Sequence, residues 1–378
     1  MRKGLCLRVF TLGFIGIILL NIQGIASIQK IQVVGDVKVI ENKKIPVLLK
    51  GTPSKLLLQK ELTIGEKDDT GSYFAQVAGF DIADDGRIFV LDFKEKNVKM
   101  FDSSGKFHGT FGKEGQGPGE WNLPTGLQLT PQRELMIEDS GNRKLIFFTL
   151  DGQFLREVSY SKKLSLINIL MDKQGNFLGR ELSFAENQIH YDITKYDPKF
   201  EPLFKIDRLS MPSPFSVKKI NPFEITSIYQ FDNRSNIIYG RSDAYKIKFY
   251  TPEGKLFKIV QKKYDPVRIT QDDKEEMIKK IPETPGINIK ENLVFPKNYP
   301  PFSYVFLDED NHLFVRTYEK GAEKVAYILD VFDSEGRFIS RCESHGLSFK
   351  WKGSKLYTLE ENEEGYHLLC RYQATWEK

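Results

Sequence analysis

The sequence is poor in the residues and motifs on which most catalytic sites depend. Its 378 residues include five histidines and three cysteines, and no two histidines stand at the spacing of a metal-ligand pair. It contains no Gly-x-Ser-x-Gly, no His-Glu-x-x-His, no phosphate loop and no dinucleotide fingerprint, since Pro118 interrupts the glycine-rich run at 115–119. Asp81, Asp84 and Asp85 lack the spaced glutamate of a calcium loop and indicate a hairpin turn. These absences argue against the common hydrolase and nucleotide-binding classes, and no cofactor is expected.

An excess of charge of either sign is also missing. The chain has 55 Lys and Arg against 51 Asp and Glu, and three of the basic residues, Arg2, Lys3 and Arg8, stand at its very beginning. The rest of the chain is close to neutral, which removes the electrostatic basis for binding nucleic acid. The partners that we expect are therefore a protein, a peptide or a small polar ligand.

Long apolar runs are absent except at the N-terminus, where residues 10–20 follow the basic residues. Gly24 and Ala26 then place small residues at the two positions that a signal peptidase reads. The pattern predicts a secretory signal peptide over residues 1–26 and a periplasmic or secreted protein with no membrane span after cleavage. An uncleaved membrane anchor is the alternative, but the apolar run is only about half of the ~20 residues that a span needs.

Cleavage at this point leaves Cys342 and Cys370 as the only cysteines. An oxidising compartment permits a bridge between them. The alternative, which we favour, is two separate thiols packed in neighbouring strands, because nothing in the spacing brings their Cα atoms within bonding range.

What the sequence does contain is one pattern of strands and turns repeated six times. Period-two alternation, as in residues 87–90, is typical of half-buried strands, and the Asp-Gly and Glu-Gly turns tolerate the positive φ of tight hairpins. One four-stranded sheet cannot bury both of its faces, whereas six sheets packed radially can. The predicted fold is therefore an all-β, six-bladed β-propeller, with blades at about 80–112, 123–160, 166–207, 225–264, 302–343 and 347–374.

The sixth copy of the pattern lacks its outer strand. Residues 55–64 have the pattern of a strand, but no partner strand lies near them in the sequence. We expect them to pair with residues 368–372 and close the ring, because closure removes two exposed sheet edges. Residues 27–54 are then a lead-in to this closing strand.

Two stretches resemble a known group of proteins. Residues 111–121, Phe-Gly-Lys-Glu-Gly-Gln-Gly-Pro-Gly-Glu-Trp, are similar to the link between blades of exported bacterial six-bladed propellers of the NHL-repeat and TolB-like kind. The loop Asp-Ser-Gly-Asn-Arg at 139–143, followed by Leu145 and Phe147, resembles an NHL-repeat core. The resemblance implies an exported propeller over roughly residues 55–374. It leaves the function open, because the fold hosts receptors, scaffolds, hydrolases and lyases.

All of the long insertions are expected on one face of the predicted disc, at 111–126, 205–224 and 264–302, because they join second to third strands or one blade to the next. Long loops on a rigid scaffold are where binding usually resides. The third insertion predicts a short helix between blades four and five, with a capping box of Thr270 and Asp273. This helix is either a lid over the central opening or, the reading we favour, a helix packed against blades four and five.

The ends of the second strands are expected to form a ring of charged residues on this face. Arg180, Arg241 and Arg316 are the candidates for ligand binding, because a guanidinium can bind a carboxylate or phosphate with two parallel hydrogen bonds. Asp92 and Asp139 in the same ring are expected to accept backbone N–H bonds from their own loops instead.

Two functions follow from this ring. The first, which we favour, is an exported propeller that binds a ligand or protein partner on its long-loop face without catalysis. The alternative is a metal-dependent, lactonase-like hydrolase or lyase that uses channel carboxylates such as Glu138 and Glu181. Both carboxylates also count as candidate ligand-binding residues, and no bound metal is expected for the favoured function.

Overall fold

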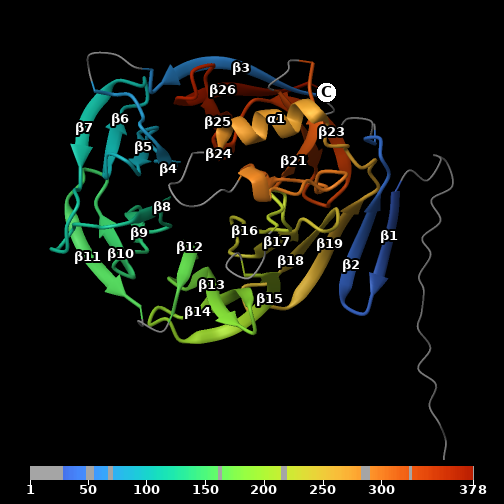
Figure 1. Cartoon of the computed structure of the whole chain (residues 1–378), viewed down its shortest axis with the longest axis horizontal. Helices are drawn as coiled ribbons and strands as arrows, with labels where there is room; N and C mark the ends of the chain where they lie inside the picture. The colour runs from blue at the N-terminus through green and yellow to red at the C-terminus, as the bar shows by residue number, and fades with distance from the viewer. Residues whose placement is uncertain are drawn as a thin grey trace, which may run out of the picture.

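The computed structural model describes residues 29–47, 55–66, 71–160, 164–213, 219–281, 290–322 and 326–377. The predicted signal peptide lies outside these residues. The described chain forms six antiparallel sheets arranged radially around a central channel, which confirms the predicted six-bladed propeller (Figure 1). Among the described residues, no helix combines the length and the apolar character needed to cross a bilayer.

Each sheet has its first strand nearest the channel and its fourth toward the outside, and in sheet 4 two further strands lie beyond the fourth (Figure 1). The strands are as follows: sheet 1, β4 (Val77–Ile82), β5 (Ile88–Asp92), β6 (Asn97–Phe101) and β7 (Phe107–Phe111); sheet 2, β8 (Pro124–Leu129), β9 (Leu135–Asp139), β10 (Lys144–Phe148) and β11 (Phe154–Ser159); sheet 3, β12 (Leu166–Met171), β13 (Phe177–Ala185), β14 (Gln188–Tyr196) and β15 (Pro202–Pro212); sheet 4, β16 (Ser227–Phe231), β17 (Ile237–Arg241), β18 (Lys246–Tyr250) and β19 (Leu256–Lys262); sheet 5, β20 (Tyr304–Leu307), β21 (Leu313–Lys320), β22 (Tyr327–Phe332) and β23 (Phe338–Ser344); sheet 6, β24 (Ser348–Lys352), β25 (Lys355–Glu361), β26 (His367–Glu377) and β3 (Lys55–Ile64).

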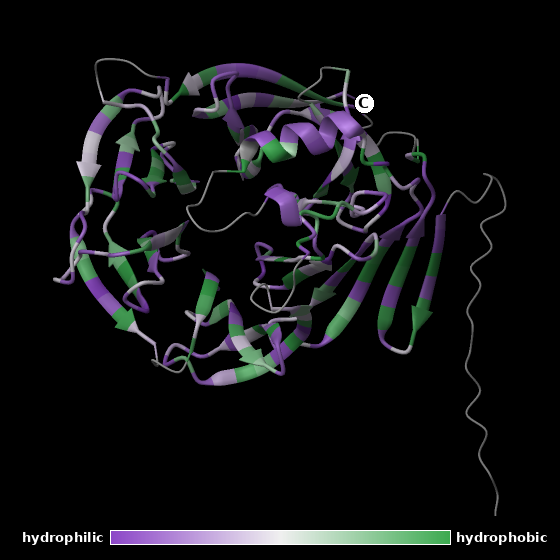
Figure 2. Cartoon of the chain, in the orientation of Figure 1, coloured by the Kyte–Doolittle hydropathy of each residue, from purple (hydrophilic) through white to green (hydrophobic). Residues whose placement is uncertain are grey.

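The apolar core lies between neighbouring sheets rather than in the centre of the disc. Apolar and polar residues alternate along the strands (Figure 2), and the apolar ones form six clusters of buried residues. At the contact between sheets 5 and 6, for example, the rings of Phe306 and Phe349 stack with their centroids 4.7 Å apart. Each sheet therefore buries both faces only when its two neighbours are present.

The ring is closed by the N-terminal strand, as predicted. Strand β3 is antiparallel to β26, from the pair Lys55–Glu377 to the pair Ile64–Leu369. Leu56 and Ile64 are buried in the clusters on the two sides of sheet 6. The first and last parts of the described chain thus share one sheet.

The predicted lead-in contains an additional hairpin. Strands β1 (Gln29–Val34) and β2 (Val37–Asn42) pair with each other, and β2 adds in parallel to β19, so that sheet 4 has six strands (Figure 1). The buried side chain of Asn42 fixes the hairpin, because it donates to the carbonyls of Gln261 and Gly336 and accepts from the N–H of Phe338. The hairpin therefore joins sheets 4 and 5 from outside.

Cys342 and Cys370 are both free and buried, as favoured. They lie in neighbouring sheets, on β23 of sheet 5 and β26 of sheet 6, and not in neighbouring strands of one sheet. Burial raises the pKa of Cys342 to about 12 and that of Cys370 to about 11, so almost no reactive thiolate is present at neutral pH.

We expect a disulfide reagent such as 5,5′-dithiobis(2-nitrobenzoate) to modify both thiols at pH 8 only when guanidinium unfolds the protein. Rapid modification of the native protein would contradict this burial.

Candidate functional site

The central channel has two different ends. Links from the second to the third strand of a sheet, and links from one sheet to the next, gather at the long-loop end, whereas hairpins between first and second strands gather at the short-turn end. Helix α1 (Gln271–Lys280) lies between β19 and β20 and therefore belongs to the long-loop end (Figure 1).

The helix at the long-loop end begins as predicted. Thr270 is its N-cap, and Thr270 and Asp273 form the reciprocal capping box. Asp273 also accepts a hydrogen bond from the hydroxyl of Tyr299, so α1 is attached to the segment that leads into sheet 5. None of the α1 residues 271–279 is buried, so the expected packing of the helix against sheets 4 and 5 stays a prediction.

Four aromatic side chains from three segments meet beside the helix, and we call them the aromatic cluster: Phe223, Phe295, Tyr299 and Tyr318. The rings of Tyr299 and Tyr318 stack 4.4 Å apart, and Phe223 contacts both of them edge-on. Phe223 belongs to the loop after sheet 3.

Arg316 lies two residues before Tyr318 on β21, and its buried charge has no carboxylate partner among the described residues. The residue is 8% exposed; its Nη1 donates to the hydroxyl of Ser303 over 2.8 Å, and its guanidinium lies 3.9 Å from the centre of the Tyr327 ring. Nε has no hydrogen-bond partner among the described residues. Burial lowers the pKa of Arg316, and the groups that oppose this shift are the hydroxyls of Tyr327 and Tyr318 rather than a carboxylate.

Arg180 has a related environment in sheet 3. Arg180 is paired with Ile193 of β14, and its guanidinium lies over the ring of Tyr191, two residues before Ile193. Arg316 has the same arrangement: it is paired with Leu329 of β22 and lies over the ring of Tyr327, two residues before Leu329. One Nη of Arg180 donates to the carbonyl of Ser227 in sheet 4, and its Nε has no partner among the described residues. Arg180 therefore joins two sheets, and one of its donors is unused.

Arg241 and Glu181 are already engaged within the protein. The guanidinium of Arg241 forms ion pairs with Asp207 at 3.3 Å and Asp243 at 2.6 Å, and the side chain is 39% exposed. Glu181 accepts a hydrogen bond of 2.9 Å from the hydroxyl of Tyr196. Of the predicted arginines, Arg316 and Arg180 are thus the two with unsatisfied donors.

Glu138 connects sheets 2 and 3. Its buried carboxylate accepts hydrogen bonds from the hydroxyl of Thr125 and from the backbone N–H groups of Asn168 and Ile169, at 2.8 to 3.2 Å. Asn168 has a φ of 56° and lies where the pairing of β12 with β13 is interrupted. The carboxylate of Glu138 therefore accepts from backbone N–H groups at a point where the strand pairing is irregular. Burial nevertheless raises the pKa of Glu138.

The two aspartates of the predicted ring have the structural role expected of them. Asp92 accepts from four backbone N–H groups, including those of Ala75 and Gln76, and Asp139 accepts from those of Asn122, Leu123 and Asn142. Each aspartate therefore holds the loop that enters its own sheet.

The carboxylates named for a metal-dependent enzyme do not converge on a metal site. Within the described residues, one group of three potential ligands lies close together, namely Asp308, Asp310 and His312 in a hairpin of sheet 5, and it includes neither Glu138 nor Glu181. In that hairpin Asp308 accepts from the N–H groups of Asp310 and His312 and from the His312 ring, which is the bonding of a turn.

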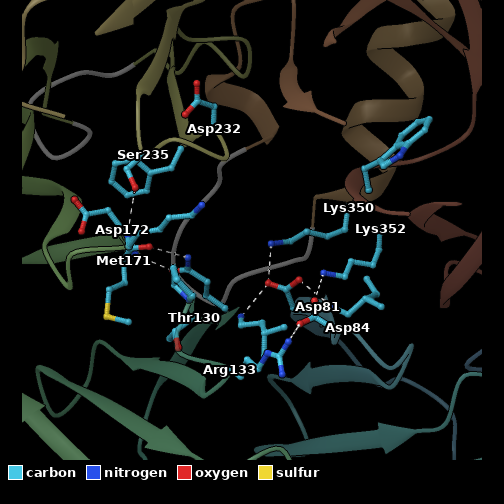
Figure 3. Close-up of a pocket in the computed structure, with 17 residues that line it drawn as sticks. Asp81, Asp84, Thr130, Arg133, Met171, Asp172, Asp232, Ser235, Lys350 and Lys352 are labelled. Atoms are coloured by element: carbon cyan, nitrogen blue, oxygen red, sulfur yellow. Dashed lines mark hydrogen bonds and ion pairs between the residues drawn. The ribbon is translucent and has the colours of Figure 1, made fainter. Parts of the chain in front are cut away.

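The short-turn end of the channel contains a cavity of about 490 Å³ (Figure 3). The last residues of five first strands line it: Ile82, Leu129, Met171, Phe231 and Lys352. A volume in this range is typical of small-molecule sites. The cavity is therefore the mouth of the channel on the face opposite the long loops.

Ion pairs form one wall of this cavity. Lys350 and Lys352 point from β24 toward Asp81 and Asp84 (Figure 3), with a distance of 3.0 Å between Lys350 and Asp81. Arg133 also binds Asp84, at 3.0 Å. Burial disfavours the charged form of Lys350, but the carboxylate of Asp81 outweighs this effect and raises the pKa of the lysine.

Sequence reasoning did not identify this cavity, because its charged groups come from turns and inner strands that carry no motif. Asp81 and Asp84 were expected only as members of a hairpin turn. A signal was present in the alternation of Lys350 and Lys352, which places both side chains on the same face of a strand.

The six radial sheets define a six-bladed β-propeller. A sequence model of the DUF5128 family, described as a 6-bladed beta-propeller, matches residues 75–337. The match covers more than half of the chain, and the protein belongs to this family. No curated protein shows significant sequence similarity to it.

Several solved structures share the fold at low sequence identity. A protein of Bacteroides fragilis described as exported has 14% identity and a TM-score of 0.55, with 90% of this chain and all of that chain covered. A DUF4221 protein of Bacteroides vulgatus has 11% identity and a TM-score of 0.50 over 86% of this chain and all of that chain. Virginiamycin B lyase of Staphylococcus aureus has 9% identity and a TM-score of 0.43, over 84% and 99%. The likeness concerns the fold alone, and the NHL-repeat and TolB-like subtype stays a prediction.

Proposed function

We propose that this protein is an exported, non-catalytic binding protein that recognises an anionic group of a ligand or peptide at the long-loop end of its channel. The signal-peptide pattern of residues 1–26 and the fold shared with a protein described as exported support the export. The observation that carries the binding function is the buried guanidinium of Arg316, which has no carboxylate partner among the described residues.

The electrostatics of Arg316 favour an incoming anion. A buried charge without a counter-charge is costly to the folded state, and a ligand carboxylate or phosphate offsets this cost when it binds. Charge-assisted hydrogen bonds to guanidinium groups are among the stronger polar contacts in proteins. The aromatic cluster beside Arg316 offers an apolar surface for the rest of the ligand.

Among the described residues, the chemistry of a hydrolase or lyase finds less support. Glu138 is held by three hydrogen-bond donors, Glu181 is bonded to Tyr196, and the two carboxylates belong to no common cluster of metal ligands. Glu138 and Glu181 therefore give the metal-dependent enzyme no support among the described residues, and binding without catalysis is the function that we propose.

The proposal is tested with a probe that combines a carboxylate and an aromatic ring. We expect N-acetylphenylalanine to bind the protein, and Arg316→Met to weaken this binding about tenfold or more, the effect of losing one charge-assisted contact. Isothermal titration calorimetry measures the affinity, and the Nε–H resonance of Arg316 reports whether the probe reaches this side chain. N-acetylphenylalaninamide, which lacks the charge, is expected not to bind.

The matched control for this experiment is Arg241→Met. Arg241 stands in the same predicted ring but is neutralised by Asp207 and Asp243, so its loss is expected to leave the probe's affinity unchanged. Arg316→Met is also expected to fold, because it removes a buried charge that no carboxylate in the described part of the chain balances. Equal affinities of the wild-type protein and Arg316→Met would refute the proposed site.

A further inference from the structure

The cavity at the short-turn end has the size and the groups of a second binding site. Its residues come from sheets 1, 2, 3, 4 and 6, so it exists only in the closed ring (Figure 3). Apolar side chains of Ile82, Leu129, Met171 and Phe231 contribute to its lining beside the ion pairs. Such a mixture suits a ligand that has an apolar body and one polar group.

The carboxylates of the cavity have little capacity left for a ligand. Asp81 accepts from Lys350 and from the N–H of Leu129. Asp172 accepts from the buried ammonium of Lys195 at 2.8 Å and from two N–H groups of its own turn. Asp232 accepts from two backbone N–H groups and one side-chain amide in the same way. The acceptors of the wall are therefore largely used by the protein.

The ammonium groups, in contrast, have donors to spare. Lys350 and Lys352 each donate to one carboxylate within the described part of the chain, although an ammonium has three N–H groups. The two lysines are two residues apart on β24 and therefore share one face of the strand, the face that meets Asp81 and Asp84 of sheet 1. Free hydrogen-bonding capacity in the cavity is thus of the donor kind.

The charges that line the cavity balance. Four cations, Arg133, Lys173, Lys350 and Lys352, face the four carboxylates of Asp81, Asp84, Asp172 and Asp232. The preference for an anionic group therefore rests on the unused N–H groups of Lys350 and Lys352 and not on net charge.

We propose that this cavity is a second ligand site, independent of Arg316, which binds a small monocarboxylate with an apolar body. The carboxylate lies between Lys350 and Lys352 and accepts their unused N–H groups, and the apolar body lies against Leu129, Met171 and Phe231. Both lysines keep their ion pairs with Asp81 and Asp84 when the ligand is bound.

The experiment uses sodium hexanoate as the probe and hexanamide as its neutral counterpart. We expect saturable binding of hexanoate by calorimetry, no binding of hexanamide, and about tenfold weaker binding to Lys352→Met, since one charge-assisted hydrogen bond is lost. Lys352→Met is preferred to a variant of Lys350. When Lys352 is lost, the carboxylate of Asp84 still has Arg133 as a partner. When Lys350 is lost, the more buried carboxylate of Asp81 loses its ion-pair partner.

Lys355→Met is the matched control. Lys355 is the cross-strand partner of Lys352, has the same 33% side-chain exposure and also forms an ion pair, but with Glu61 of the outer strand β3. We expect Lys355→Met to bind hexanoate like the wild-type protein. We expect the same of Arg316→Met, and this result would separate the cavity from the long-loop site. Unsaturable binding of hexanoate, or equal affinities of Lys352→Met and Lys355→Met, would overturn the second site whatever the outcome at Arg316.

Discussion

A chain of residues 67–378 is expected to melt more than about 10 °C below a chain of residues 27–378, or not to fold cooperatively at all. The deletion removes β3, whose backbone pairs with β26 along its whole length, and the side chains of Leu56, Leu58, Leu62 and Ile64, which pack on both sides of sheet 6. Burying one such side chain contributes about 1.5–3 kcal/mol, and folded domains are stable by only about 5–15 kcal/mol in total. Differential scanning calorimetry and far-UV circular dichroism measure the loss.

Two further samples separate the closing strand from the outer hairpin. A chain of residues 48–378 lacks β1 and β2 but keeps β3. We expect it to lose the parallel pairing of β2 with β19 and the buried contacts of Ile40 and Asn42, and to melt a few degrees lower. A synthetic peptide of residues 55–66 is expected to restore part of the stability of the 67–378 chain by occupying the vacant edge beside β26. The closure has no energetic role if chains 27–378 and 67–378 melt at the same temperature.

Asp330→Ala is expected to reduce the free energy of unfolding by about 3–5 kcal/mol, the cost of leaving a buried charge without its partner. Asp330 is fully buried on β22 and accepts from the Lys262 ammonium at 2.8 Å, from the Arg341 guanidinium at 3.0 Å and from the hydroxyl of Tyr245. Lys262 and Tyr245 belong to sheet 4, so one carboxylate joins two neighbouring sheets. Guanidinium denaturation followed by tryptophan fluorescence measures the difference.

Asp265→Ala is the control for this substitution, because Asp265 forms an ion pair with Lys44 while its side chain is 80% exposed. An exposed pair contributes about 0–1 kcal/mol, so we expect this variant to unfold almost like the wild-type protein. Adding Lys262→Met to Asp330→Ala is expected to recover part of the loss, because the lysine charge is no longer buried without a partner. If the two alanine variants are equally stable, the buried pair does not hold sheets 4 and 5 together.

Much of the fold could be predicted because its determinants are local. Turn aspartates such as Asp172 and Asp232 bind N–H groups two and four residues ahead, and the capping box of α1 spans Thr270 to Asp273. The closing strand was predictable from a different fact, namely that residues 55–64 needed a partner and the last blade lacked one. The hairpin of β1 and β2 was missed because its partner, β19, belongs to a sheet that already had four strands.

The candidate site was predictable only in part. The sequence predicts Arg180, Arg241 and Arg316 at the ends of second strands. Arg241 does end β17, whereas Arg180 and Arg316 lie in the middle of the longer strands β13 and β21. Their surroundings, however, depend on residues of other segments, and so does the difference between Arg316, which has no carboxylate partner among the described residues, and Arg241, which has Asp207 and Asp243.

Periodicity and turn chemistry in the chain were enough to specify six sheets, their order and the strand that closes them, because a strand's alternation and a turn's hydrogen bonds involve residues only a few positions apart. The partners of each charge were decided by the closed ring. Lys350 meets Asp81 across 269 positions of sequence, and no local pattern encodes that distance. Whether a charged side chain is neutralised, or is left to bind a ligand, is therefore a property of the assembled channel.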